Sequence, residues 1–571
     1  MAYCLPKHLA NDFLKKIKSG EISPDKLTKM TSQERNATFA ELLGKENSQK
    51  VNALFESKLL LKNQQQGIIS WVKTVGGMKA EVKRDILSKV EKMTEVLQPA
   101  EKTAFLNDLV TQKLGMSVSL EEANTIAKLA KDISDKRTIR DAGGDRLEYG
   151  RAKVAFGNYV SDLKNASKRL TPLEMLASPV RLVTEVAGTS KAIKASMDNS
   201  AIFRQGWKTL WTHPLIWQKN ARRSFVDIWQ TFGKTSVMNE LKADIYSRPN
   251  YNLMVKAKLA VGTVEEEFPS TLPRKIPLVG KVYKASENAF TAFVYRQRAD
   301  IFDKYVDVAR KNGIDLTDKL QIESIGKLVN SLVGRGNIGR LEPVADILNN
   351  VFFSPRLLKS HIDVLTLHSA DKMSGFARKQ AAINLLKIIS GTAAVLATAE
   401  AIRPGSVEKD PRSADFGKIR VGDTRFDVSG GMASIVVLAS RLISQSTKSS
   451  TTGRVREINT GKYGASTGKD VIYNFFENKL SPAARAARDI LEGKDFDGKK
   501  PTALSTLNTL YTPIIIENYD ELKNNPKAAD VLGAMIADGL GIGTNTYSRQ
   551  KKQLKKDTSW KLMDLLKKNT K

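Results

Sequence analysis

Signals for helix starts recur along this sequence, and they constrain the fold more than any other feature. Two Ser-Pro pairs, Ser354-Pro355 and Ser481-Pro482, indicate helix starts, and Gly375 and Gly493 are the predicted ends of those helices. Three further pairs match the capping box, in which a hydroxyl and a carboxylate each accept a hydrogen bond from a free backbone N–H: Thr31 with Glu34, Ser119 with Glu122, and Thr171 with Glu174. We therefore predict a mainly α fold, an elongated multi-helix protein.

Strand signals are confined to one short segment. Residues 418–428 (KIRVGDTRFDV) alternate apolar and polar side chains on either side of Gly422-Asp423. This pattern is typical of two short strands joined by a tight turn. We expect one small β-hairpin near residues 418–428 and no other clear one.

Changes in composition divide the chain into three regions. Residues 1–170 form an N-terminal helical region, and residues 171–405 form a central helical region with a cluster of tryptophan and basic residues. Residues 406–571 hold the hairpin, a Ser/Thr/Gly-rich segment, C-terminal helices and a basic tail. We expect the Ser/Thr/Gly-rich segment, 444–468, to be extended or mobile rather than helical.

The charge balance is strongly basic and favours polyanionic partners. The chain has 91 Lys and Arg residues against 61 Asp and Glu, which gives a net charge of +30. Nucleic acid and anionic membrane both fit this excess. A single cysteine, Cys4, allows no intrachain disulfide and no thiolate metal cluster, and there are only four histidines. This composition argues against an enzyme.

Motifs for nucleotide or metal binding all lack a required part. GRGNIG at 334–339 follows a helical rather than a strand pattern, and we expect a turn between helices there. GASTGKD at 464–470 lacks the first glycine and the hydroxyl residue of a phosphate loop. His361 and His368 are seven residues apart on one predicted helix face, with no third histidine nearby. We assign no catalytic, cofactor-binding or metal-binding residues, and no cofactor.

Two apolar segments are candidates for membrane contact or for the core. The first is 388–399 (IISGTAAVLATA), and the second is 428–440 (VSGGMASIVVLAS). Both are shorter than the roughly 18 uncharged residues that indicate a membrane-spanning helix. We expect buried core helices, with contact to a membrane after rearrangement as the alternative.

Aromatic and basic residues are interleaved in two places. Side chains of both kinds suit a membrane interface, and they also suit stacking on bases beside phosphate contacts. The alternative is a tryptophan core with solvated cations, and for the tail a solvated segment. The candidate contact residues between 201 and 234 are Trp207, Lys208, Trp211, Trp217, Arg222, Arg223 and Trp229. Those in the tail, 549–571, are Lys551, Lys552, Lys555, Lys556 and Trp560.

Three phrases resemble a helical module of phage large polyvalent proteins and internal virion proteins. They are RQGWKTLWTHPLIW at 204–217, PLVGKVYKASENAFTAFVYRQRADIFDKYVDVARKNG at 277–313 and NNVFFSPRLLKSHIDVL at 349–365, and the resemblance covers roughly residues 170–500. None of these phrases is a catalytic motif. Longer members of the family often carry a fused enzyme domain such as a lysozyme-like transglycosylase, and residues 1–170 indicate only helices.

The resemblance implies a non-enzymatic internal virion (ejection) protein. Such a protein is packaged in the phage head and is delivered with the genome into the host envelope or cytoplasm, where it assists DNA transfer. Its partners would be portal, tail or other ejection proteins, phage DNA and the host membrane, and the protein would be a homo-oligomer. The alternatives are an injected cytoplasmic DNA-binding or anti-host protein, and a static scaffold at the portal or tail.

Overall fold

The computed structural model describes most of the 571 residues in eight long stretches. These are 22–74, 119–167, 199–232, 236–261, 279–461, 466–495, 500–511 and 539–546, with a few short pieces at 11, 15–19, 88, 90, 189–190 and 537. The chain separates into two compact units, Met1–Arg169 and Leu170–Lys571, and each is described by itself. Helices dominate both units, so the mainly α prediction is confirmed.

The first unit consists of helices in its described part. It contains α2 (Pro24–Lys29), α3 (Ser32–Leu43), α4 (Lys45–Thr74), α7 (Leu120–Asp141) and α8 (Arg146–Ser167). The predicted capping boxes at Thr31 and Ser119 are both present, and they start α3 and α7. The third predicted box, at Thr171, lies outside the described residues.

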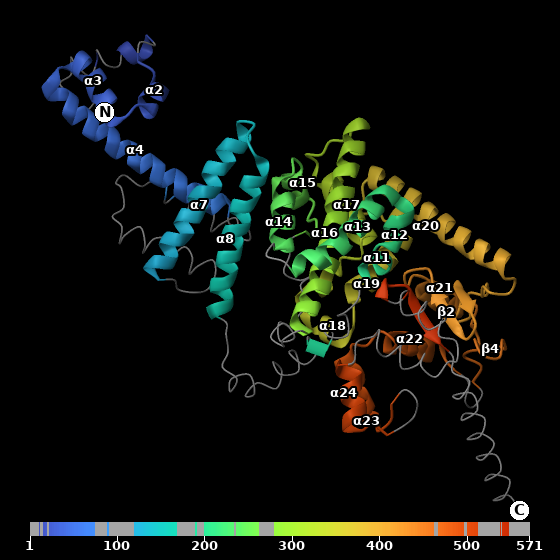
Figure 1. Ribbon diagram of the computed structural model, residues 1–571. Coiled ribbons are helices and arrows are strands. Elements are labelled where there is room, and N and C mark those ends of the chain that lie inside the picture. Colours follow the sequence, from blue (N-terminus) through green and yellow to red (C-terminus); the bar gives the residue numbers. More distant parts are fainter. Residues whose placement is uncertain are drawn as a thin grey trace, which may run out of the picture. The chain divides into compact units, whose positions relative to one another are not determined.

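The second unit is built around one long helix, α16 (Val279–Lys311), against which α13 (Pro214–Thr231) packs along much of its length (Figure 1). Buried aromatic and aliphatic side chains of α16, such as Phe293, Phe302 and Val306, form the centre of the core. The remaining helices of this part are α11 (Ala201–Arg204), α12 (Trp207–Thr212), α14 (Val237–Ser247), α15 (Tyr251–Lys256), α17 (Lys319–Leu332), η4 (Gly339–Val344), α18 (Ala345–Val351), α19 (Pro355–Thr366), η5 (Leu367–Ser369) and α20 (Gly375–Ile402).

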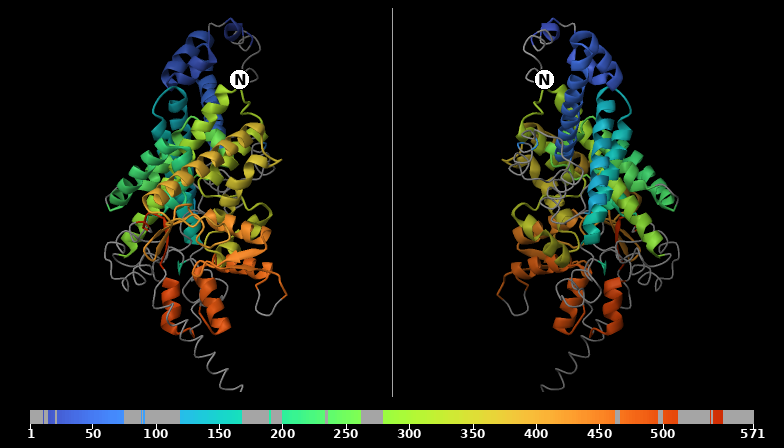
Figure 2. Two further views of the ribbon diagram at one scale, coloured as in Figure 1. Left: turned by 90° about the vertical axis from the view of Figure 1, so that its right-hand side faces the viewer. Right: turned by 90° about the vertical axis from the view of Figure 1, so that its left-hand side faces the viewer.

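The C-terminal part of the second unit mixes short strands with helices. Its helices are α21 (Ala433–Ile443), α22 (Gly468–Glu477), α23 (Pro482–Glu492) and α24 (Ala503–Tyr511). Its strands are β1 (Lys418–Val421), β2 (Thr424–Asp427), β3 (Ser446–Lys448), β4 (Val455–Glu457) and β5 (Gly543–Thr546). In both views of Figure 2 the red-orange helices α23 and α24 lie at one end of the unit, whereas Gly541, just before β5, lies against the backbone of Ser200 at the start of α11.

The predicted hairpin is confirmed, and it is not alone. β1 and β2 pair as antiparallel strands around Gly422, whose φ of 59° is the left-handed conformation that the tight turn requires. β5 adds to the edge of β2, with Asn545 opposite Arg425. A second hairpin, β3–β4, forms within the Ser/Thr/Gly-rich segment. The expectation of a single hairpin was wrong. The alternating pattern that predicted β1–β2 is absent from β3–β4, and the pairing of β5 with β2 joins segments far apart in the sequence.

Two smaller predictions are corrected and two are confirmed. Gly375 does not end a helix, because Ser374 caps the start of α20 by accepting a hydrogen bond from the Ala377 N–H. His361 lies buried in α19, whereas His368 lies exposed in η5, so the two do not share a helix face. Gly493 ends α23 with a φ of 68°, as predicted. The GRGNIG segment forms the turn that leads from α17 into η4, also as predicted.

Candidate membrane-contact site

The indole rings of the predicted tryptophan cluster are mostly part of the core. Trp207 is 5% exposed, and its ring packs edge-on against Trp211 with the ring centres 5.3 Å apart. Trp217 is half-buried and donates a hydrogen bond to the carbonyl oxygen of Ile202 at 2.9 Å. The alternative of a tryptophan core is therefore confirmed for Trp207, and the prediction of contact with a membrane or nucleic acid was wrong for this residue, because neighbouring helices cover its ring.

Lys208 is also buried, although it was a candidate for phosphate or headgroup contact. Its ammonium group donates hydrogen bonds to the carbonyl oxygen of Ser331 at 3.0 Å and to the Ser360 hydroxyl at 3.1 Å. Burial lowers the pKa of Lys208 to about 7, and the nearby carboxylate of Asp363 opposes that shift. The side chain joins α12 to α17 and α19 in the core and is not available to a partner.

One face of α13 keeps the predicted combination of aromatic and basic side chains at the surface. Arg222, Phe225, Val226 and Trp229 recur at helical spacing, and all are exposed, Trp229 by 79%. Arg223 is also exposed, but it pairs with the buried carboxylate of Asp227. Contact with a membrane or nucleic acid remains a prediction for this face. The tail candidates, Lys551, Lys552, Lys555, Lys556 and Trp560, lie outside the described residues.

The most unusual surface of the second unit belongs to α20. This helix has 28 residues and contains the apolar segment 388–399 in its second half. At 1.5 Å per residue its length is about 42 Å, against about 30 Å for the hydrocarbon core of a bilayer. By length and composition α20 could cross a membrane, and only 17% of its most apolar stretch of 18 residues is buried. The expectation of a buried core helix, too short for a span, was therefore wrong.

Burial along α20 is limited to its first half. The buried side chains are Ala377, Ala381, Asn384 and Ile388, and no residue from Ile389 to Ile402 is buried. Figure 1 shows the C-terminal half of α20 extending beyond the other helices of its unit. Apolar residues occur on every side of this half. A helix with that distribution is normally covered by protein or by lipid.

The tryptophans of α12 hold the middle of α20 in place. The Trp207 indole N–H donates a hydrogen bond to the Thr392 hydroxyl at 3.2 Å. Gly391 lies directly against the Trp211 ring, so closely that any side chain at this position would overlap the indole. In the first half, the Asn384 amide and the Tyr305 hydroxyl are hydrogen bonded in the core. These contacts fix one side of the helix, and the rest of its C-terminal half faces outward.

The loop after α20 ties its end to the rest of the unit. The Ser406 hydroxyl donates a hydrogen bond to the carbonyl oxygen of Ala399 at 3.0 Å. The Glu400 carboxylate accepts hydrogen bonds from the Lys409 ammonium group at 2.9 Å and from the Val407 backbone N–H at 3.1 Å. The loop then enters β1. Both ends of α20 are thus anchored, while the side of the helix that carries Ile389, Ala393 and Ala397 is exposed.

Comparisons with protein-family models, with curated proteins and with solved structures found no match to this chain.

Proposed function

We propose that this chain is a non-enzymatic internal virion protein of a phage that is delivered with the genome and inserts α20 into the host envelope. The exposed apolar surface of α20 carries the proposal. Each Å² of apolar surface left in water costs roughly 25 cal/mol relative to burial, and lipid removes that cost without new protein contacts.

The charges of α20 fit an inserted segment. Between Lys387 and Glu400 the helix has no charged residue, and this segment ends close to the exposed Ile402. The side chain of Lys387 has four methylene groups, which allow a lysine to reach the headgroup region while its backbone lies deeper. Arg378 and Lys379 lie a further two turns away, on the part of the helix that the core holds.

The phage setting of the proposal rests on the resemblance of three sequence phrases. In the structure these phrases contribute to the packed second unit. His213 packs edge-on against Tyr305 with the ring centres 5.3 Å apart, and Pro214 and Pro355 open α13 and α19. The three phrases therefore belong to the packed helices that support α20. The basic net charge suits a protein packed beside DNA.

A fluorophore placed on α20 tests insertion directly. In a Cys4→Ser background, Ile389→Cys labelled with an environment-sensitive dye should brighten and shift to the blue when phospholipid vesicles are added. Ile389 is 54% exposed, so the label does not disturb the core. The matched control is Ile347→Cys on α18, an isoleucine that is 62% exposed. Equal responses at both positions, or none at Ile389, would reject the proposal.

A further inference from the structure

Three elements of the C-terminal part enclose a hollow of about 760 Å³. One face of α21 contributes Ser434, Val437, Leu438 and Arg441, which follow one another at helical spacing. α22 contributes Val471, Asn474 and Phe475, Asn478 follows at its end, and the β3–β4 hairpin closes the third side. The volume lies within the range of roughly 300–1,000 Å³ that is typical of ligand sites.

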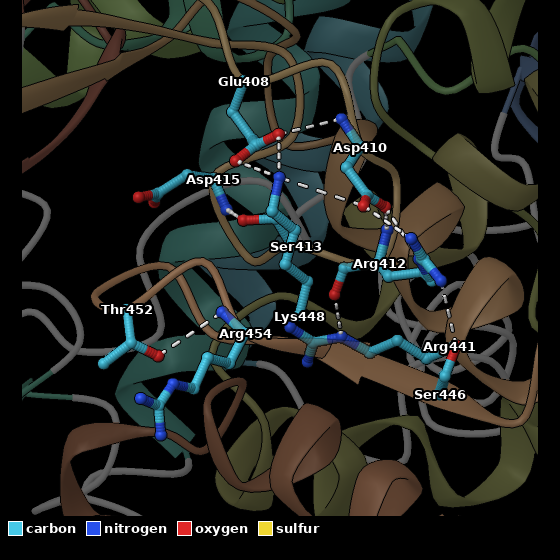
Figure 3. Close-up of polar contacts among 10 residues, drawn as sticks. All are labelled: Glu408, Asp410, Arg412, Ser413, Asp415, Arg441, Ser446, Lys448, Thr452 and Arg454. Carbon is cyan, nitrogen blue, oxygen red and sulfur yellow. Dashed lines mark hydrogen bonds and ion pairs between the residues drawn. The ribbon is translucent and has the colours of Figure 1, made fainter. Parts of the chain in front are cut away.

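A network of charges fixes one wall of the hollow (Figure 3). The Lys448 ammonium group binds both carboxylate oxygens of Glu408, at 2.9 and 3.0 Å. The carboxylate of Asp410 pairs with the Arg412 guanidinium at 2.8 Å, and these hydrogen bonds lower the pKa of Asp410 to about 2. The Arg441 Nε–H donates to the carbonyl oxygen of Arg412 at 2.7 Å. This bond orients Arg441 and leaves both terminal nitrogens of its guanidinium without a partner among the described residues.

Four cations around the hollow have no carboxylate partner among the residues that the structure describes. They are Arg441, Arg454, Arg456 and Lys479. Arg454 and Arg456 are exposed on the hairpin, and the Arg454 guanidinium in Figure 3 contacts none of the residues drawn. Lys479 is half-buried, with its nitrogen 3.5 Å from the Ser434 hydroxyl. Burial lowers the pKa of both Lys479 and Arg441, and the nearby carboxylate of Asp427 opposes the shift of Lys479.

The rest of the lining combines hydroxyl groups and apolar side chains with two asparagines and one carboxylate, that of Glu457. Thr447, Ser449, Ser450, Thr452 and Ser466 bring hydroxyls to the hollow. Val437, Ile458 and Val471 are buried apolar residues of its lining. Large apolar side chains are also exposed on the elements that form the hollow, with Ile443 at 83%, Tyr473 at 58% and Val455 at 46%.

We propose that this hollow binds the phosphate group of an anionic phospholipid, with the guanidinium groups on the phosphate and the apolar lining against the glycerol and the first acyl carbons. Hydroxyl and guanidinium donors match phosphate oxygens, and an anion relieves the mutual repulsion of cations that lack carboxylates. A duplex of nucleic acid is too broad to enter a hollow of this size, and it would leave the apolar lining in water. The inference rests on the proposed membrane insertion, because it assigns a second lipid contact to the same unit.

Binding to vesicles tests the hollow separately from α20. The double variant Arg454→Gln, Arg456→Gln changes two exposed side chains on the hairpin, so folding should be retained. The control variant Arg340→Gln, Arg420→Gln removes the same charge from two other exposed positions. With vesicles that contain phosphatidylglycerol, the hairpin variant should bind about 30-fold more weakly than the parent, and the control should bind much more tightly than the hairpin variant. With phosphatidylcholine vesicles the parent and the hairpin variant should bind alike.

The outcomes separate the two proposals. Equal losses in the hairpin variant and the control would show attraction by net charge and overturn the lipid site. A loss of duplex DNA binding in the hairpin variant, with phosphatidylglycerol binding unchanged, would assign the hollow to nucleic acid and also overturn it. Either result leaves membrane insertion intact if the dye at residue 389 still responds to phosphatidylcholine vesicles. A dye that responds to no vesicle instead rejects the insertion of α20.

Discussion

Helices α16 and α20 belong to the same unit, but the helix with many charged residues is buried and the apolar helix is largely exposed. α16 carries many charged residues and is buried along most of its length, with Glu287 at 3% and Arg298 at 2% exposure. The Arg298 guanidinium donates hydrogen bonds to the carbonyl oxygens of Ala260 and Val333, which offset its lost hydration. α20 is almost free of charge in its second half, and no residue of that half is buried. Apolar composition alone therefore does not place a helix in the core. A helix is buried only where other helices or strands of the unit pack against it.

The contrast predicts a large difference in what the two helices contribute to stability. Phe302→Ala in α16 removes a fully buried ring and should lower the free energy of unfolding by about 3–5 kcal/mol. Ile389→Ala in α20 should change it by less than about 0.5 kcal/mol, since more than half of that residue is already exposed to water. Urea unfolding of both variants measures the difference. Similar decreases in the free energy of unfolding for both variants would show that Ile389 is buried in solution, and would contradict the difference between α16 and α20.

The buried lysine of α12 predicts a dependence of stability on pH. The pKa of Lys208 in the folded protein is about 7, below its ordinary value of 10.5, so the unfolded chain holds one more proton between these values. Stability should rise with pH from about 7 to about 10, by at most about 1.4 kcal/mol per pH unit from this group. Lys208→Met should flatten that rise in unfolding curves recorded across the range. A variant with the same slope as the parent would place the ammonium group in solvent.

The anchor of α20 predicts a smaller effect at Gly391. Gly391→Ala places a methyl group in the Trp211 ring, and such overpacking typically costs about 1–3 kcal/mol. Ala393→Ser on the exposed side of the same helix is the control and should be close to neutral. Thermal unfolding followed by tryptophan fluorescence measures both variants. An unchanged midpoint for Gly391→Ala would mean that α12 does not support this part of α20.

Local features of the sequence predicted local structure well. The capping boxes at Thr31 and Ser119 and the hairpin around Gly422 depend on residues a few positions apart, and all three are present. β5 could not be predicted in this way, because it pairs with a strand more than a hundred residues earlier, where Asn545 lies opposite Arg425. The β3–β4 hairpin lacks the alternation of apolar residues that marks a half-buried strand.

The candidate site could be predicted only in part, because exposure is a property of the whole unit. The sequence identified both the tryptophan cluster and the apolar segment 388–399 as the unusual stretches. It could not show that the Trp207 indole contacts Thr392 in the core, or that no described residue of α20 after Ile388 is buried. It also left the hollow unpredicted, because the lining residues come from three elements whose proximity only the fold defines.

The depth of α20 in a bilayer tests the central claim most directly. Single cysteines at Ile389, Ala393, Ala397 and Ile402 in the Cys4→Ser background can each carry a dye, with the quencher attached to lipid acyl chains at known depths. The account predicts quenching by acyl-chain quenchers at Ile389, Ala393 and Ala397, which are exposed and, at a spacing of four residues, lie on one face of the helix. Absence of quenching at every position, with the vesicles bound, would contradict the insertion of α20.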